Sequence, residues 1–213
     1  MKMNFARFFV LATLVSLQAN AASLVDGDAA AGKSKAVTCS ACHGAEGNSV
    51  NPSWPNIAGQ NAKYLVAQLK AFQPGEDGAP ALRSDPLMTS MALPLSDEDI
   101  RDLAIYFEGL PAAANSVADE KLVARAEALY RGGNNDKQVP ACLACHGPTG
   151  RGNPAATYPA LNGQHSVYTA KQLRDYASGA RKSTSKTHMM RDIADRLSDE
   201  DIKAIASYVQ GLK

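Results

Sequence analysis

Apolar residues recur at α-helical spacing in matching stretches of the two halves of the chain. After Gln60 and Gln164, the side chains that share one helical face are Tyr64, Gln68, Leu69 and Phe72 in the first half and Tyr168, Gln172, Leu173 and Tyr176 in the second. A later stripe consists of Ile100, Leu103, Ala104 and Phe107, and its counterpart of Ile202, Ile205, Ala206 and Val209. Each stripe predicts a helix with one face turned inward.

The two later helices carry clear end signals. Ser96 and Ser198 can act as N-caps because their hydroxyls can accept from free backbone N–H groups, and acidic residues fill the turn that follows. Gly109 and Gly211 are expected to end these helices. A further helix is predicted before each cysteine motif, near residues 28–37 and 120–130. Because no stretch alternates as a strand would, the predicted fold class is all-α.

The chain is an internal repeat. Cys39-Ser40-Ala41-Cys42-His43-Gly44 recurs as residues 142–147, Pro55-Asn56-Ile57-Ala58-Gly59-Gln60 matches residues 159–164, and residues 95–100 recur unchanged as 197–202. This period is too long for a solenoid and predicts a duplicated domain. We expect domain 1 over residues 22–110, a linker over 111–118 and domain 2 over 119–213, in keeping with the usual size of compact domains.

The first 21 residues have the features of a cleaved signal peptide. Lys2 and Arg7 precede the apolar run Phe8–Leu17, and Ala19-Asn20-Ala21 supplies small residues for cleavage before Ala22. The alternative, a membrane anchor, is disfavoured because the run is far shorter than the ~20 residues that span a bilayer. The sequence therefore predicts a protein secreted to the bacterial periplasm.

Charge is unevenly distributed between the two halves. Residues 22–111 contain six basic and eleven acidic side chains, whereas residues 112–213 contain fourteen and ten. Such a dipole can orient a protein against charged partners, although chance drift of surface charge would give the same pattern. Nothing in the sequence points to nucleic-acid binding.

Cys-x-x-Cys-His is the attachment signature of c-type haem, in which both thiols bond to the haem and the histidine binds its iron. The motif occurs twice in register. Cys39 and Cys42 are thus predicted to hold one haem and Cys142 and Cys145 a second. His43 and His146 are the predicted iron ligands on one side of each haem.

Three other interpretations of the cysteines are weaker. A structural zinc site usually separates its Cys-x-x-Cys pairs by ~15–20 residues, whereas Cys42 and Cys142 are 100 positions apart. Redox-active disulfides of this spacing belong to a βαβ framework that the sequence lacks. Purely structural cysteines would leave the histidine after both pairs unexplained.

An electron-transfer haem needs a second axial ligand. After residue 21 the methionines are Met88, Met91, Met189 and Met190. Aligning the halves on Leu95 and Leu197 pairs Met88 with Met190 and leaves the other two without a methionine counterpart. Met88 and Met190 are therefore the predicted second ligands, and His165 and His188 are interpreted as surface residues.

Histidine and methionine together would close the iron to small ligands and favour outer-sphere, one-electron transfer, with the thioether raising the potential. In so small a domain the haem must form a large part of the core, so the apoprotein is expected to fold poorly.

These motifs resemble the cytochrome c4 family of dihaem c-type cytochromes over essentially all of residues 22–213. The resemblance implies two tandem cytochrome c-like domains related by pseudo-twofold symmetry, with His43/Met88 and His146/Met190 as axial pairs. It also implies that the carbonyls of Pro55 and Pro159 orient the histidines, and that the haems lie close together.

As to partners, the resemblance implies a carrier between quinol-oxidising complexes and a terminal haem-copper oxidase of a respiratory chain, loosely associated with the membrane surface. A monomer is expected. The main alternative is the dihaem subunit of a periplasmic dehydrogenase, such as a flavocytochrome sulfide dehydrogenase. A dihaem peroxidase is disfavoured because it needs an open iron, and two methionines lie in register.

The halves are not identical. The second has an extra stretch around Asn134–Gln138 and carries Arg151 near its haem motif without a basic counterpart in the first. Because surrounding negative charge stabilises ferric iron, we expect the first haem to have the lower potential.

Overall fold

The computed structural model describes residues 23–75, 78–184 and 187–213. The predicted signal peptide, residues 1–21, lies outside this part. In the described ranges, no helix has both the length and the apolar character needed to cross a membrane.

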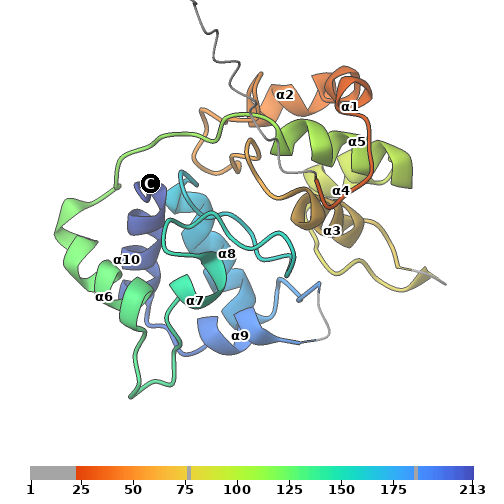
Figure 1. Cartoon of the computed structure of the whole chain (residues 1–213). Coiled ribbons are helices and arrows are strands. Elements are labelled where there is room, and N and C mark those ends of the chain that lie inside the picture. The colour runs from red at the N-terminus through yellow and green to blue at the C-terminus, as the bar shows by residue number, and fades with distance from the viewer. Residues whose placement is uncertain (1–22, 76–77, 185–186) are drawn as a thin grey trace, which may run out of the picture.

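Helices make up nearly all regular structure in both halves (Figure 1). The first half contains α1 (Ala29–Lys35), α2 (Val37–His43), α3 (Ala62–Phe72), α4 (Pro86–Ala92) and α5 (Asp97–Glu108). The second contains η2 (Glu120–Leu122), α6 (Val123–Gly132), α7 (Leu143–His146), α8 (Ser166–Ser178), α9 (Met189–Ala194) and α10 (Asp199–Gln210). Apart from two isolated bridges, the described residues form no β-structure. The predicted all-α class is confirmed.

The later helix of each half forms the centre of its core. The helix α5 packs against α1 and α3, and α10 packs in the same way against α6 and α8. The crossing of α1 and α5 is very close: a Cβ atom on Gly32 would lie 2.1 Å from the backbone oxygen of Asp102. Only glycine fits there, so this position fixes how the helix that leads into the first cysteine motif sits on α5.

The predicted caps of these later helices are present. Ser96 and Asp99 form a reciprocal capping box on α5, and Ser198 and Asp201 form the same box on α10. Ion pairs link α5 to α1, and α10 to α6 and the turn that follows α6. In the first half Lys35 bridges Asp99 and Asp102, each at 2.7 Å. In the second half Arg125 and Lys137 share Asp201, at 2.6 and 2.9 Å.

The approach to the cysteine motif differs between the halves. In the first, α2 follows α1 after only Ala36 and continues through the motif to His43. In the second, α6 ends at Gly132, and a turn closed by a bridge between Asn134 and Val139 precedes α7. The extra stretch recognised in the sequence is this turn, from which Lys137 reaches Asp201.

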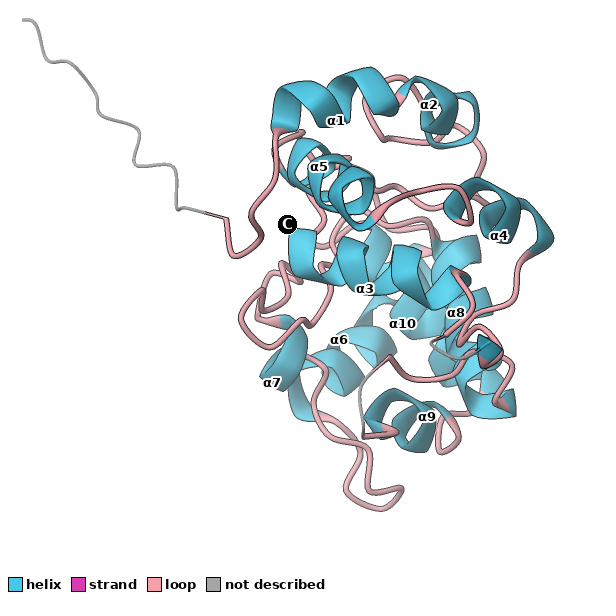
Figure 2. Ribbon diagram, turned by 90° about the vertical axis from the view of Figure 1, so that its right-hand side faces the viewer, coloured by secondary structure: helices cyan, strands magenta, loops and turns pink. Residues whose placement is uncertain are grey.

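The segment expected to be a linker contains no helix and lies along both halves. Asn48 donates to the carbonyl of Pro111, Asn115 to that of Gly163, and Gln210 to that of Ser116. These bonds fix the segment to the protein, so the halves are not joined by a free tether. In Figure 2 the halves are stacked, with α3 and α8 between the outer helices α1 and α9.

Candidate functional site

The predicted site residues of both halves line one continuous cavity. Its volume is about 1220 Å³, above the roughly 300–1,000 Å³ typical of a site for one small ligand. Both sets of predicted residues face it, namely Cys39, Cys42, His43, Met88, Cys142, Cys145, His146 and Met190. A cavity of this size with two matching sets of donors suits two bulky groups.

His43 and His146 are the last residues of α2 and α7, and both are buried. His43 Nδ1 lies 2.8 Å from the carbonyl oxygen of Pro55, and His146 Nδ1 lies 3.0 Å from that of Pro159. Because a carbonyl can only accept, Nδ1 must carry the proton and Nε2 keeps its lone pair. Burial lowers the pKa of both imidazoles, which keeps them neutral. Each ring is thus in the tautomer that binds a metal through Nε2.

The four cysteines are half-buried, and none of them is paired in a disulfide. Burial raises the pKa of Cys39, and it raises that of Cys142 to about 11. Redox-active Cys-x-x-Cys motifs and zinc sites instead depend on stabilised thiolates. In addition, no group of three or more histidine, cysteine or acidic side chains in the described ranges is arranged to hold a metal ion. Among the described residues, the cysteines therefore lack the further ligands that a structural zinc site needs.

The methionines lie on α4 and α9, two short helices at equivalent places in the repeat. Met88 and Met190 each stand four residues before a fully buried alanine, Ala92 or Ala194, and both are half-buried. The two methionines without a counterpart are more exposed, Met91 at 47% and Met189 at 39%. All four line the cavity, but the position and burial of Met88 and Met190 match across the halves.

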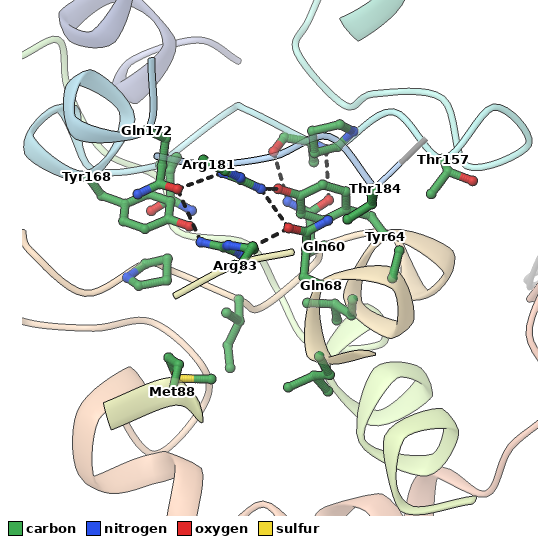
Figure 3. Close-up of a pocket in the computed structure, with 18 of the residues that line it drawn as sticks. Gln60, Tyr64, Gln68, Arg83, Met88, Thr157, Tyr168, Gln172, Arg181 and Thr184 are labelled. Carbon is green, nitrogen blue, oxygen red and sulfur yellow. Dashed lines mark hydrogen bonds between the residues drawn. The ribbon is translucent and has the colours of Figure 1, made fainter. Parts of the chain in front are cut away.

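Two arginines meet in the part of the cavity between the halves (Figure 3). Arg83 donates to the side-chain oxygens of Gln68 and Gln172 at 3.0 and 3.1 Å, and Arg181 donates to the same two oxygens at 2.6 and 2.7 Å. Each guanidinium also stacks on an aromatic ring of its own half, Arg83 on Phe72 and Arg181 on Tyr176.

This cluster is rich in positive charge. Arg181 is 5% exposed, and its buried Nε atom has no hydrogen-bond partner. Among the described carboxylates, none forms an ion pair with Arg83 or Arg181. Buried charge is costly unless it is paired. The arrangement fits a group that brings carboxylates into the cavity, as haem does with its two propionates.

Sequence reasoning missed this arginine pair. The available signal was Gln68 and Gln172, two amides on the otherwise apolar faces that predicted α3 and α8. Sequence reasoning also predicted that His165 lies at the surface. Its ring is instead half-buried, and its Nε2 lies 2.9 Å from the carbonyl oxygen of Ser49 in the other half. His188 is exposed as expected.

The family model for cytochrome c matches the chain twice, over residues 29–111 and 123–213. Together with the fold and the paired Cys-x-x-Cys-His sites, these matches define a cytochrome c with two haem domains. Cytochrome c4 from Azotobacter vinelandii is 48% identical over 189 residues, which cover 87% of this chain and 90% of the relative. The chain belongs to the cytochrome c4 family.

A solved structure agrees in fold over most of the chain. Reduced recombinant cytochrome c4 from Pseudomonas stutzeri superposes with a TM-score of 0.82 at 44% identity, covering 88% of this chain and all of that one. A thiosulfate dehydrogenase electron acceptor from Stutzerimonas stutzeri is 35% identical over 93% of this chain and 90% of its own length. The protein is an electron-transfer protein with two covalently bound haem c groups.

Proposed function

We propose that the protein carries single electrons in the periplasm, with each haem iron bound by one histidine and one methionine. His43 and Met88 are the axial pair of domain 1, and His146 and Met190 that of domain 2. The proposal is carried by one observation: both sets of donors face a single cavity with each histidine in the metal-binding tautomer. We assign domain 1 to residues 22–110, the linker to 111–118 and domain 2 to 119–213.

Each residue of the site has a distinct part in holding the haems. Cys39 and Cys42 would form the thioether bonds to one haem, and Cys142 and Cys145 those to the other, because all four line the haem-sized cavity. The carbonyls of Pro55 and Pro159 accept from the histidine Nδ1 atoms and so fix the rings and make the Nε2 atoms better donors.

The arginine pair supplies the charge that the haem carboxylates need. Arg83 and Arg181 are already held in place by Gln68 and Gln172, so little side-chain entropy is lost when a carboxylate binds. Bound there, haem iron would supply the change of one electron, and a histidine and a methionine that both bind it would leave no place for oxygen or peroxide. The residues therefore favour a carrier over a peroxidase.

The finer assignments concern compartment and partners. The features of residues 1–21 support secretion to the periplasm. We infer that electrons pass from quinol-oxidising complexes toward a terminal haem-copper oxidase, and that the protein works as a monomer loosely associated with the membrane surface. The charge difference between the halves would orient it during such encounters.

A second candidate is favoured by the thiosulfate dehydrogenase electron acceptors among the relatives. On this account the donor is a periplasmic dehydrogenase and not a quinol-oxidising complex. Because the haem sites would be the same, only the donor separates the two functions. Rapid-mixing reduction by each purified donor decides between them.

The carrier proposal itself is tested on protein matured in a host that attaches c-type haem. We expect two covalent haems per chain, rapid electron exchange with small redox reagents and no turnover of peroxide. The variant C39S/C42S should keep one haem, and C142S/C145S the other. Peroxide turnover, or a single haem in the unchanged protein, would contradict the proposal.

A further inference from the structure

The glutamine that ends the repeated Pro-x-x-x-Gly-Gln motif reaches across to the opposite half. Gln164 Oε1 accepts from the backbone N–H of Asn56 at 2.9 Å, and Gln164 Nε2 donates to the backbone oxygen of Asn56 at 2.7 Å. In the reverse direction, Gln60 Oε1 accepts from the N–H of Ala160 at 2.8 Å and Gln60 Nε2 donates to its oxygen at 2.9 Å. Each glutamine thus holds the backbone N–H and C=O of one residue in the opposite half, an arrangement that we call a clamp. The two clamps are related by the internal repeat.

Each clamp acts on the peptide group that holds a histidine. The N–H of Asn56 and the carbonyl of Pro55 belong to one peptide unit, and that carbonyl accepts from His43 Nδ1 at 2.8 Å. A continuous relay therefore runs from Gln164 through a single peptide group to His43, from domain 2 into domain 1.

The second relay runs the opposite way. Gln60 accepts from the N–H of Ala160, which shares its peptide group with the carbonyl of Pro159, and this carbonyl accepts from His146 Nδ1 at 3.0 Å. Gln60 is buried at 8% exposure, so water does not compete freely for its amide.

We propose that Gln164 and Gln60 are positioning residues that tune the haem of the opposite domain: Gln164 acts on the haem bound by His43, and Gln60 on the haem bound by His146. The proposal rests on the histidines being iron ligands, as proposed above. It gives the repeated motif a second role, because the interface then links the two redox centres as well as joining the domains.

The direction of the effect follows from hydrogen-bond cooperativity. A peptide group whose N–H donates to a good acceptor carries more negative charge on its oxygen. That oxygen accepts more strongly from the histidine Nδ1–H, which makes Nε2 a more basic ligand. A more basic ligand stabilises ferric iron, so each glutamine lowers the potential of the haem across the interface.

The test is a redox titration of the whole dihaem protein followed by nuclear magnetic resonance, with the haem methyl signals of each domain tracked separately. In Q164L the potential of the domain 1 haem should rise while that of domain 2 stays unchanged, and Q60L should give the converse. Equal shifts of both haems in either variant, or a shift of the haem in the glutamine's own domain, would overturn the proposal.

Two further variants separate tuning from loss of interface strength. Q164E keeps an acceptor oxygen opposite the Asn56 N–H and should not raise the domain 1 potential. N61A removes another hydrogen bond across the interface, from Asn61 Nδ2 to the oxygen of Tyr158 at 2.8 Å, and should move neither potential. A rise in Q164E, or a shift in N61A as large as that in Q60L, would contradict the relay.

Failure of the ligand assignment gives a different result. If the unchanged protein lacks the spectroscopic signature of histidine–methionine ligation, the axial pairs are wrong and the relay falls with them. If that signature is present and the crossed shifts are not, the relay alone is wrong.

Discussion

Arg181 places its Nη2 atom 2.6 Å from the side-chain oxygen of Gln68, although the two residues belong to different halves of the chain. Arg83 makes the reverse contact with Gln172 at 3.1 Å. The interface thus concentrates two positive charges where the two haem sites meet. If Arg83 and Arg181 bind the haem carboxylates as proposed, both haems share one set of cations, and a change at either arginine affects both redox centres.

Replacing Arg181 with methionine should lower both potentials and the stability of the holoprotein. Loss of a nearby positive charge favours ferric iron, and the haem carboxylates lose their buried partner. Breaking such a buried pair costs about 3–5 kcal/mol. Potentiometric titration and guanidinium unfolding measure the two effects. The control K203M removes an exposed charge that pairs with Asp199, and it should change the potentials and the stability far less. Unchanged potentials in R181M would refute the shared site.

Asp201 gives the stability an acid-sensitive component. Burial works to raise its pKa, but Lys137, Arg125 and the Ser198 cap together lower it. A lowered folded pKa means that the contribution is complete above the unfolded value of 3.8 and is lost as the pH falls through the folded value. At neutral pH the free energy of unfolding of D201N should therefore be about 1–3 kcal/mol lower than that of the unchanged protein. This difference in stability should narrow only below about pH 4.

Denaturant unfolding of both proteins between neutral and acid pH measures this gap. The matched control is D199N. Asp199 begins the same helix, but its side chain is 56% exposed and its ion pairs with Arg174 and Lys203 lie at the surface, so the difference in stability should be much smaller than for D201N. A gap that widens toward acid pH would contradict the sign derived for Asp201.

The haem of domain 1 should have the lower potential. Residues 22–111 carry six basic and eleven acidic side chains, against fourteen and ten in residues 112–213, and negative surroundings stabilise ferric iron. Because surface charges are screened by salt, with a Debye length of about 8 Å at physiological ionic strength, the difference should shrink as salt is added. A domain-resolved redox titration in which the domain 1 haem had the higher potential would contradict the attribution of this difference to surface charge.

Removing both haems should largely unfold the protein. The variant with serine at all four cysteines cannot attach haem, and the cavity of about 1220 Å³ would lose its filling. Small domains have little other apolar area to bury. Far-ultraviolet circular dichroism should show most of the helical signal lost, and a fully helical, cooperatively unfolding apoprotein would disprove the structural role of the haems.

The fold was largely predictable because the repeat aligns the same signals twice. The stripe ending at Phe107 and the cap at Ser96 indicate α5, and their counterparts indicate α10. The helices α4 and α9 were missed, since neither has a long apolar stripe. For α4 a signal existed: Asp85 caps the helix and Pro86 occupies its first turn.

The part of the site between the domains could not be predicted. Arg83 and Arg181 are 98 positions apart, outside the offset of the repeat, so aligning the halves does not pair them. Their meeting depends on how the domains are packed, and so do the clamps of Gln60 and Gln164. A pattern within one chain segment carries no information on which surfaces face each other.

The most direct test of the central claim is the weak ferric charge-transfer band that reports an iron–methionine sulfur bond, measured in four alanine variants. In M88A and M190A the band should fall by about half, because each removes one of two such bonds. In M91A and M189A, which change methionines on the same two helices, it should stay unchanged. A full band in M88A or M190A, or a loss in either control, would contradict the assignment of His43/Met88 and His146/Met190 as the axial pairs.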